Sequence, residues 1–132
     1  MAFKKKNVSL TTTSADVSTT VALGAAYGRV HAFDILSTGT DTAIRLKLTD
    51  ADAKVFYLDA ADKDYDTARI HTVISDDDTR TGLTYTPRDA TGAAVTATFT
   101  QPVPVVKSPI TVSIINGGTV TDTVDVNLYV EI

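Results

Sequence analysis

The end of the chain, residues 119–132, alternates apolar and polar side chains with a period of two. Successive side chains of a strand point to opposite faces, so this pattern predicts a β-strand with one buried and one solvated face. Asp122, beside the preceding turn, is the one polar exception on the apolar side. A chain that ends in a long amphipathic strand is expected to be an all-β scaffold. The apolar positions are all even: Val120, Val124, Val126, Leu128, Val130 and Ile132.

The choice of amino acids favours strands along the rest of the chain as well. Glu131 is the only glutamate, and every other acidic residue is an aspartate, which competes with the helical backbone and favours turns. Threonine and valine are abundant, and both are β-branched residues that suit a pleated surface. The chain has no cysteine, which excludes disulfides, thiolate metal sites and cysteine catalysis.

Short alternating or apolar segments recur along the chain, with Gly- and Asp-containing turns between them. They predict about nine or ten short strands in an all-β fold, a β-sandwich of the jelly-roll or immunoglobulin-like type. The segment 29–37 is apolar on both faces and is expected to be a central strand. A length of 132 residues fits one domain, predicted over residues 8–132 and preceded by a flexible basic arm, residues 1–7.

The final strand is expected to form a C-terminal hairpin with residues 109–115. A three-residue loop, 116–118, would place Ile114 opposite Val120 and keep even positions on one face. Upstream of this hairpin, residues 101–109 hold three prolines, which lack the donor that a central strand needs. This piece is predicted to be an extended connection or an edge.

No catalytic motif is present, and we predict that the chain is not an enzyme. The two histidines, His31 and His71, fall within predicted strands. If these strands were neighbours, the imidazoles could share a metal ion, but a third ligand at defined spacing is missing. Two partly exposed strand histidines are therefore the favoured interpretation.

An acidic loop offers a weak calcium hypothesis. Asp62, Asp64 and Asp66 have the spacing that opens a calcium-binding loop, but Thr67 stands where such a loop needs glycine and Val73 where it needs glutamate. The EF-hand interpretation fails, while an irregular site that shares other aspartates, from residues 50–52 or 76–78, stays open. A solvated loop that supports solubility is favoured, so no cofactor is expected.

The overall charge and hydropathy argue against two classes of partner. The formal net charge is −4, which is opposite to that of a nucleic-acid-binding domain. No apolar run approaches the roughly 20 residues of a membrane-spanning helix. We therefore expect neither nucleic acid nor membrane as a partner.

The segment 103–131 resembles the end of small virion proteins of tailed bacteriophages. The resemblance is carried by the Lys-Ser-Pro-Ile-Thr-Val strand at 107–112, the glycine turn after it and the Leu-Tyr-Val-Glu strand at 128–131. It is similar in kind to the capsid-decoration, or cement, proteins, and covers about a quarter of the chain. The resemblance implies a small, β-rich, cysteine-free and non-catalytic protein. It also implies a homo-oligomer, with a trimer favoured, that binds the major capsid protein on the capsid surface of the virion.

The function expected from the sequence is therefore that of a non-enzymatic virion structural protein that decorates and stabilises a phage capsid. Two alternatives are another phage head or tail component, and a soluble glycan- or protein-binding β-sandwich module. A basic arm can dock on an acidic shell, and a proline-rich connection is ordered before binding, which lowers its entropic cost. The candidate contact residues are Phe3, Lys4, Lys5, Lys6, Pro102, Pro104 and Tyr129.

Overall fold

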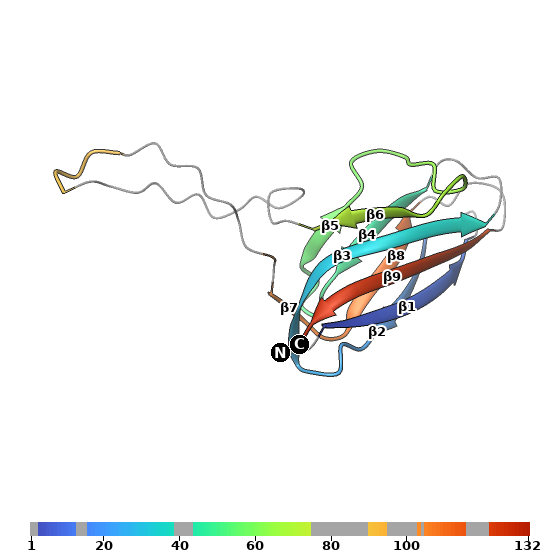
Figure 1. Cartoon of the computed structure of the whole chain (residues 1–132), viewed down its shortest axis with the longest axis horizontal. Coiled ribbons are helices and arrows are strands. Elements are labelled where there is room, and N and C mark those ends of the chain that lie inside the picture. The colour runs from blue at the N-terminus through green and yellow to red at the C-terminus, as the bar shows by residue number, and fades with distance from the viewer. Residues whose placement is uncertain are drawn as a thin grey trace.

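The protein is a β-sandwich of two antiparallel sheets (Figure 1). The computed structural model describes residues 3–12, 16–38, 44–74, 90–94, 103, 105–115 and 122–132. Sheet A has the order β1-β9-β3-β6, with β7 also paired to β3, and sheet B has the order β2-β8-β4-β5. The strands are β1 (Phe3–Thr11), β2 (Val17–Val21), β3 (Tyr27–Thr38), β4 (Arg45–Thr49), β5 (Val55–Leu58), β6 (Ile70–Val73), β7 (Val105–Lys107), β8 (Ile110–Ile115) and β9 (Thr123–Glu131).

The strands β6 and β7 are two halves of one edge strand of sheet A. Both run antiparallel to β3: Val73 lies opposite Ala32, and Val105 lies opposite Arg29. The chain thus leaves the edge of β3 at the end of β6 and returns, at the start of β7, to nearly the same point along β3. The prediction that the proline-rich region leads into an edge is confirmed for β7, whereas Pro102 and Pro104 lie outside the described residues.

The pairing of the strands is nested, which identifies the jelly-roll type of sandwich. The first strand pairs with the last (β1 with β9), and the second strand pairs with the second-to-last (β2 with β8). Further inward along the chain, β3 pairs with β6 and β7, and β4 pairs with β5. This is a long antiparallel ribbon rolled up so that its strands alternate between two sheets. The predicted sandwich is therefore confirmed, and the immunoglobulin-like alternative, in which more consecutive strands pair directly, is wrong.

The predicted C-terminal hairpin is also wrong. β8 pairs with β2 and β4 in sheet B, whereas β9 pairs with β1 and β3 in sheet A. Both strands direct their even-numbered side chains into the same core. Burial of the even positions is therefore expected when the chain crosses from one sheet to the other, as well as when the two strands form a hairpin. Alternation tells which face is buried but does not tell which strand is the neighbour.

The predicted flexible arm of residues 1–7 is wrong from Phe3 onward. Residues 3–7 are the first half of β1, and they pair in continuous register with β9, from Phe3 opposite Glu131 to Asn7 opposite Asn127. The run Lys4–Lys6 had suggested a solvated terminus. An edge strand tolerates these lysines because its outer side meets water, and charged side chains are a common feature of such edges.

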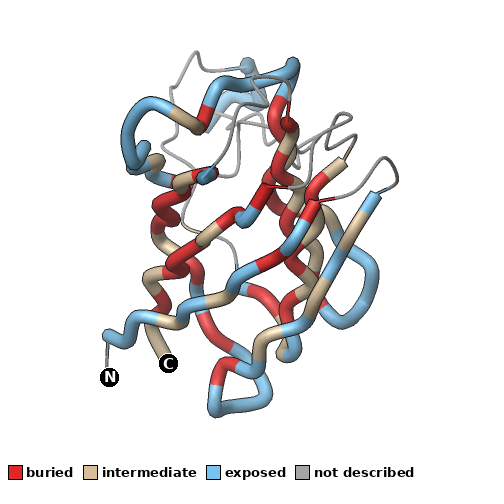
Figure 2. Tube along the Cα trace, turned by 90° about the vertical axis from the view of Figure 1, so that its right-hand side faces the viewer, coloured by how far each residue is buried: buried red, intermediate tan, exposed pale blue. Residues whose placement is uncertain are grey.

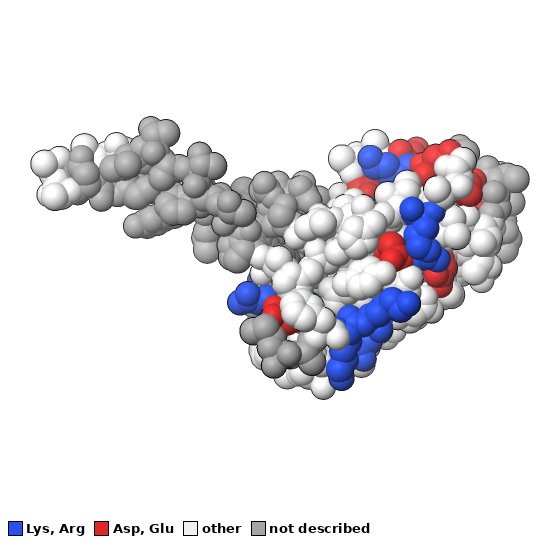
Figure 3. All heavy atoms as spheres, viewed as in Figure 1, with Lys and Arg blue, Asp and Glu red and all other residues white. Residues whose placement is uncertain are grey.

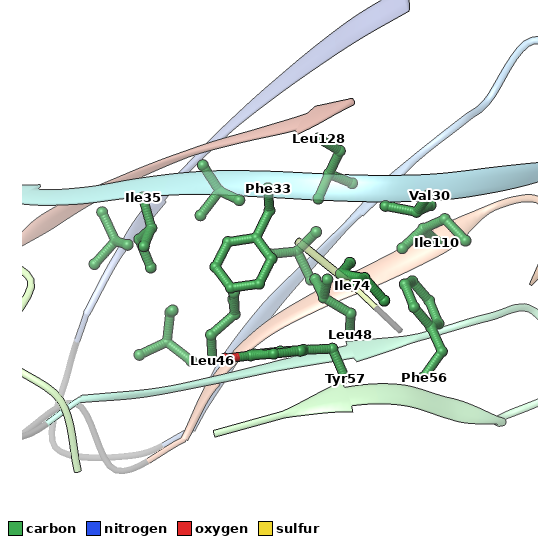
Figure 4. Packing of buried hydrophobic residues seen from close by; sticks show 14 of the residues in the cluster. Val30, Phe33, Ile35, Leu46, Leu48, Phe56, Tyr57, Ile74, Ile110 and Leu128 are labelled. Atoms are coloured by element: carbon green, nitrogen blue, oxygen red, sulfur yellow. The ribbon is translucent and has the colours of Figure 1, made fainter. Parts of the chain in front are cut away.

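The core lies between the two sheets and is formed mostly by aliphatic side chains (Figures 2 and 4). Alternate residues of β9 and β8 are fully buried, as the alternating pattern predicts. Phe33 of β3 points from sheet A into the middle of the core and packs edge-on against Tyr57 of β5, with ring centroids 4.7 Å apart. These two rings join the sheets at the centre of the molecule.

A β-bulge at His31 divides the central strand β3 into two halves. Val30 lies opposite Val130, and the next paired residue is Ala32, opposite Tyr129, so His31 is the additional residue. The bulge changes which residues face inward, from even positions before it to odd positions after it. This explains why both faces of this segment are apolar in the sequence. Strand β3 is central, as expected.

Gly28 is required by close packing at the beginning of β3. A Cβ atom at this position would lie 2.9 Å from Cγ2 of Ile132 and 3.0 Å from the carbonyl oxygen of Glu131. The second atom belongs to the backbone of β9, so a side chain here would force the two strands apart.

Two buried aspartates hold the loops of sheet B. Asp59 is 1% exposed, and its carboxylate accepts hydrogen bonds from Oη of Tyr57 (2.6 Å), Oη of Tyr65 (2.7 Å) and the backbone N–H of Leu46 (2.8 Å). Burial, followed by the hydrogen bond to Asp59, raises the pKa of Tyr65 above its usual value. Asp50 accepts from the backbone N–H groups of Asp52 and Lys54 and so closes the turn between β4 and β5.

Candidate functional site

The outer face of sheet A presents side chains from five strands in register, with β6 and β7 sharing one edge. Residues that are paired across antiparallel strands point to the same face, so the rows follow directly from the pairing. The first two rows lie at the end of the sheet where β9 finishes, and the third and fourth lie further along β1 and β3. In order from β1 outward, the rows are Phe3, Glu131, Arg29 and Val105; Lys5, Tyr129, Ala32 and Val73; Asn7, Asn127, Asp34 and His71; and Ser9, Asp125 and Leu36.

Asp34 is the centre of a hydrogen-bond network on this face. Its carboxylate accepts from Nη1 of Arg69 (2.5 Å), from Nδ2 of Asn127 (2.8 Å) and from the hydroxyl of Tyr129. Asp34 is only 6% exposed and Asn127 only 8%, although both point away from the core. The side chains around them, which include Tyr129 and Arg69, shield them from water and fix their orientation.

Asp125 extends the network to the edge strand β1. It accepts from Nη2 of Arg69 (2.6 Å), from Nδ2 of Asn7 (2.8 Å) and from the hydroxyl of Ser9 (3.2 Å). Arg69 thus bridges two carboxylates with its two terminal nitrogens, a geometry that the planar guanidinium is suited to. The contacts link β1, β9, β3 and Arg69, the residue before β6, in one connected set of side chains.

Two carboxyl groups of this network have lowered pKa values. For Asp34, burial raises the pKa, but hydrogen bonds from Tyr129, Asn127 and Arg69 outweigh it and hold the pKa below the usual value of 3.8. For Asp125, the hydrogen bond from Asn7 lowers the pKa most, with further lowering by Arg69 and Ser9. The network therefore holds both groups as carboxylates.

We predict that this network makes the fold sensitive to acid. Folding lowers the pKa of such a carboxyl group, so the group stabilises the folded protein at pH values above the pKa that it has in the unfolded chain. This stabilisation is lost as the pH falls below about 3.8 and through the lower pKa of the folded state. Urea unfolding between about pH 6 and about pH 2 measures the loss. The double variant D34N/D125N should be less stable at neutral pH and show a flatter acid limb. An acid limb as steep as that of the native chain would contradict this assignment.

The other half of the outer face is apolar and aromatic. We call it the apolar end, formed by Phe3, Tyr27, Val73 and Val105, which are 71%, 58%, 67% and 50% exposed. The ring of Phe3 lies 5.4 Å from the ring of His31, whose Nε2 lies 3.0 Å from Oε1 of Glu131. Four of the five exposed large hydrophobic residues among the described ones belong to this end. A rigid polar half beside an exposed apolar half is typical of a protein-binding surface.

The residues predicted as contacts from the sequence are partly brought together. Phe3, Lys5 and Tyr129 lie on the outer face of sheet A, whereas Lys4 and Lys6 point to the opposite side of the same edge strand. Figure 3 shows the basic side chains gathered along β1 and a separate mixed group of acidic and basic side chains on the same face. The edge strand β1 is therefore the basic border of this surface.

The two histidines lie on neighbouring strands, but they do not form a metal site. His71 is opposite Asp34 and packs edge-on against Tyr129, with ring centroids 5.6 Å apart. The backbone carbonyl of His31 accepts from Ile74, so His31 and His71 are offset by roughly 10 Å along the sheet. Within the described residues no three acidic, His or Cys side chains are grouped to hold a metal ion.

The weak calcium candidates do not gather either. Asp62 and Asp64 are exposed, and Oδ1 of Asp64 accepts the backbone N–H of Asp66 (3.0 Å) in a local turn. Between them, Lys63 pairs with Ile44, and Tyr65 is buried on Asp59. The loop that carries these aspartates is thus anchored to the body through the backbone of Lys63 and the side chain of Tyr65.

No helix in the part of the chain that the structure describes is suited to span a membrane.

The sequence offered little sign of the residues that organise this face. Asp34, Arg69, Asp125 and Asn127 are polar residues at outward positions, where solvated side chains are expected. The available signal was local: two carboxylates and an amide lie near the middle of long apolar strands, a place where β-propensity is low for them. Their mutual contact depends on the jelly-roll pairing, which brings residue 34 beside residue 127.

Fold and site together define the chain as a jelly-roll β-sandwich with a hydrogen-bonded polar network and an exposed apolar end on the outer face of sheet A. The sequence matches no protein-family model, no curated protein and no solved structure in comparisons with each of these groups.

Proposed function

We propose that this chain is a non-enzymatic structural protein of a virion, one that decorates the capsid of a tailed phage and binds the major capsid protein. The observation that supports this most is the outer face of sheet A. Its polar half is held by hydrogen bonds before any partner arrives, so binding would cost little side-chain entropy. Its apolar end offers exposed aromatic rings, the side chains that most often dominate binding energies.

The fold adds a weaker, analogical argument. Jelly rolls recur in viral capsid domains and in lectins, and folds by themselves do not determine function. The resemblance of residues 103–131 to small phage virion proteins favours the first of these settings. We further propose that the protein acts as a homo-oligomer, with a trimer favoured, on the capsid surface.

The test is binding to tailed-phage heads that lack their decoration protein, measured by co-sedimentation. We expect saturable binding by the native chain and at least tenfold weaker binding by F3A/Y27A, which removes two exposed rings of the apolar end at little cost in stability. The control is T20A, on the exposed face of sheet B. No binding by the native chain, or equal binding by F3A/Y27A and T20A, would count against the proposal.

A glycan-binding module is the second candidate, favoured by one observation. The face places the rings of Phe3, His31, Tyr129 and His71 beside the polar groups of Asn7 and Asp125, and sugars bind to such mixtures of flat rings and hydrogen-bonding groups. The test is binding of the native chain to an immobilised glycan panel. Glycan binding that is lost in F3A/Y27A, together with no binding of the native chain to phage heads, would favour this candidate over the first.

A further inference from the structure

Sheet A has two edges that differ in charge. On one edge, β1 carries the run Lys4–Lys6, and among the described strands β1 pairs only with β9, so its outer backbone groups have no strand partner there. The other edge is formed by β6 and β7. The sequence that follows β6 contains an acidic run, Asp76–Asp78. One sheet thus has a basic, open edge on one side and an acidic segment attached to the other.

The segment between β6 and β7 is long, and both of its ends lie beside the same part of β3. Residues 74–104 lie between β6 and β7, whose ends lie opposite Ala32 and Arg29 of the same strand. Residues 90–94, near the middle of this segment, form an exposed turn that lies away from both sheets (Figure 1). From Ile74 to this turn, an extended chain can span up to roughly 60 Å, which exceeds the width of a small domain.

The sequence of this segment suits an open strand edge. Residues 93–100 alternate, with Val95, Ala97 and Phe99 at every second position and threonines at 96, 98 and 100. An alternating segment can add to an exposed edge by main-chain hydrogen bonds. The acidic run in the same segment complements the lysines of β1, which provides selectivity for this edge.

We infer that the open edge of β1 is a docking site for residues 75–104 of a second copy of this chain. The inference rests on the self-association that belongs to the proposed function, and it supplies the contacts for it. The docking is head-to-tail, because the donor edge and the acceptor edge are different surfaces. A head-to-tail contact produces a closed ring when the rotation between copies closes, and an open filament when it does not.

The lysines of β1 have a competing explanation, which the experiment must separate. Charged residues on an edge strand also prevent indiscriminate pairing with other strands. If Lys4–Lys6 only blocked the edge, reversing their charge would leave self-association unchanged. If they receive the acidic run of another copy, the reversal repels that run and separates the copies.

The experiment measures molar mass in solution by light scattering on the full chain. We expect a multiple of 14.0 kDa for the native protein, and the mass of one chain for K4E/K5E/K6E and for D76K/D77K/D78K. The chain that carries all six substitutions restores opposite charges on the two edges and should recover the native mass. The control K47E/K54E/K63E changes the same charge in sheet B and its loops, and should keep the native mass.

Several results would overturn the inference. They are a native protein that stays at the mass of one chain, a K4E/K5E/K6E variant that keeps the native mass, and a folded six-fold variant that fails to recover it. Thermal unfolding of each variant confirms that it is folded. Phage-head binding is measured separately with F3A/Y27A. Because these two substitutions leave the lysines and the acidic run unchanged, a failure of the capsid proposal can be told apart from a failure of the docking proposal.

The copy that donates the segment is identified by cross-linking. Because the chain has no cysteine, A94C and N7C are each the only thiol in their chain, and Asn7 lies on the open edge strand β1, next to the lysines. Residues 94 and 7 should form a disulfide between two chains when the two variants are mixed under oxidation. A chain with both cysteines that cross-links only within itself would show that the segment folds back on its own protomer, and would overturn the inference.

Discussion

Replacing Asp59 by alanine is expected to lower the free energy of unfolding by about 3–5 kcal/mol. The carboxylate is buried and accepts three hydrogen bonds, from Tyr57, Tyr65 and the backbone of Leu46. Its removal takes the carboxylate acceptor away from two phenol hydroxyls and one backbone N–H in a site closed to water, and each buried hydrogen bond lost in this way costs about 1–3 kcal/mol. Chemical unfolding of the two proteins at neutral pH measures the difference.

Two milder variants separate the hydrogen bonds of Asp59 from its volume. Y65F removes one donor and keeps the ring, and should cost about 1 kcal/mol. D59N keeps the shape but replaces one acceptor by a donor that faces the donors around it, so its cost should lie between those of Y65F and D59A. If D59A were no more destabilising than Y65F, the carboxylate could not be the acceptor that holds these loops.

Replacing Phe33 by alanine is expected to cost about 3–5 kcal/mol, for a reason unrelated to hydrogen bonds. The ring is fully buried between the two sheets and packs edge-on against Tyr57. Its removal loses the burial of an aromatic side chain and leaves a cavity between two rigid sheets, which can collapse only in part. Denaturant unfolding with an unchanged m-value would attribute the loss to packing.

A residue on the opposite face of the same strand provides the control. Leu36 also belongs to β3, but its side chain points to the outer face of sheet A, beside Asp125, where it is half-buried. L36A should therefore cost only about 1 kcal/mol. A larger loss for L36A than for F33A would mean that the bulge at His31 does not change the direction of the side chains as described.

The sequence was sufficient to predict the class of fold, because alternation is a local property. The pattern in residues 119–132 is reproduced in β9, where Val124, Val126, Leu128 and Val130 are buried. Partnership between strands is not local. The parity of Ile114 and Val120 suited a hairpin, but the same parity results when two strands lie in opposite sheets and share one core.

The candidate site was harder to predict, because its residues are distant in the chain and chemically unremarkable one by one. Tyr129 and Phe3 could be proposed from their size and polarity, whereas Asp34 and Arg69 gain their role only from each other. The bulge at His31 also changes the parity of β3, and no residue type in the sequence specifies a bulge there.

The nested order of the strands also has a consequence for how the chain reaches its native state. β9 lies between β1 and β3, so sheet A receives its central strand only after every other described strand has been synthesised. Until then, β1 has no partner, and both neighbours of β9 expose the edges that β9 will cover. Because the contacts that close the roll join strands that are far apart in the chain, folding should be slow. Until β9 pairs with β1, the lysines of β1 should discourage aggregation through this exposed edge.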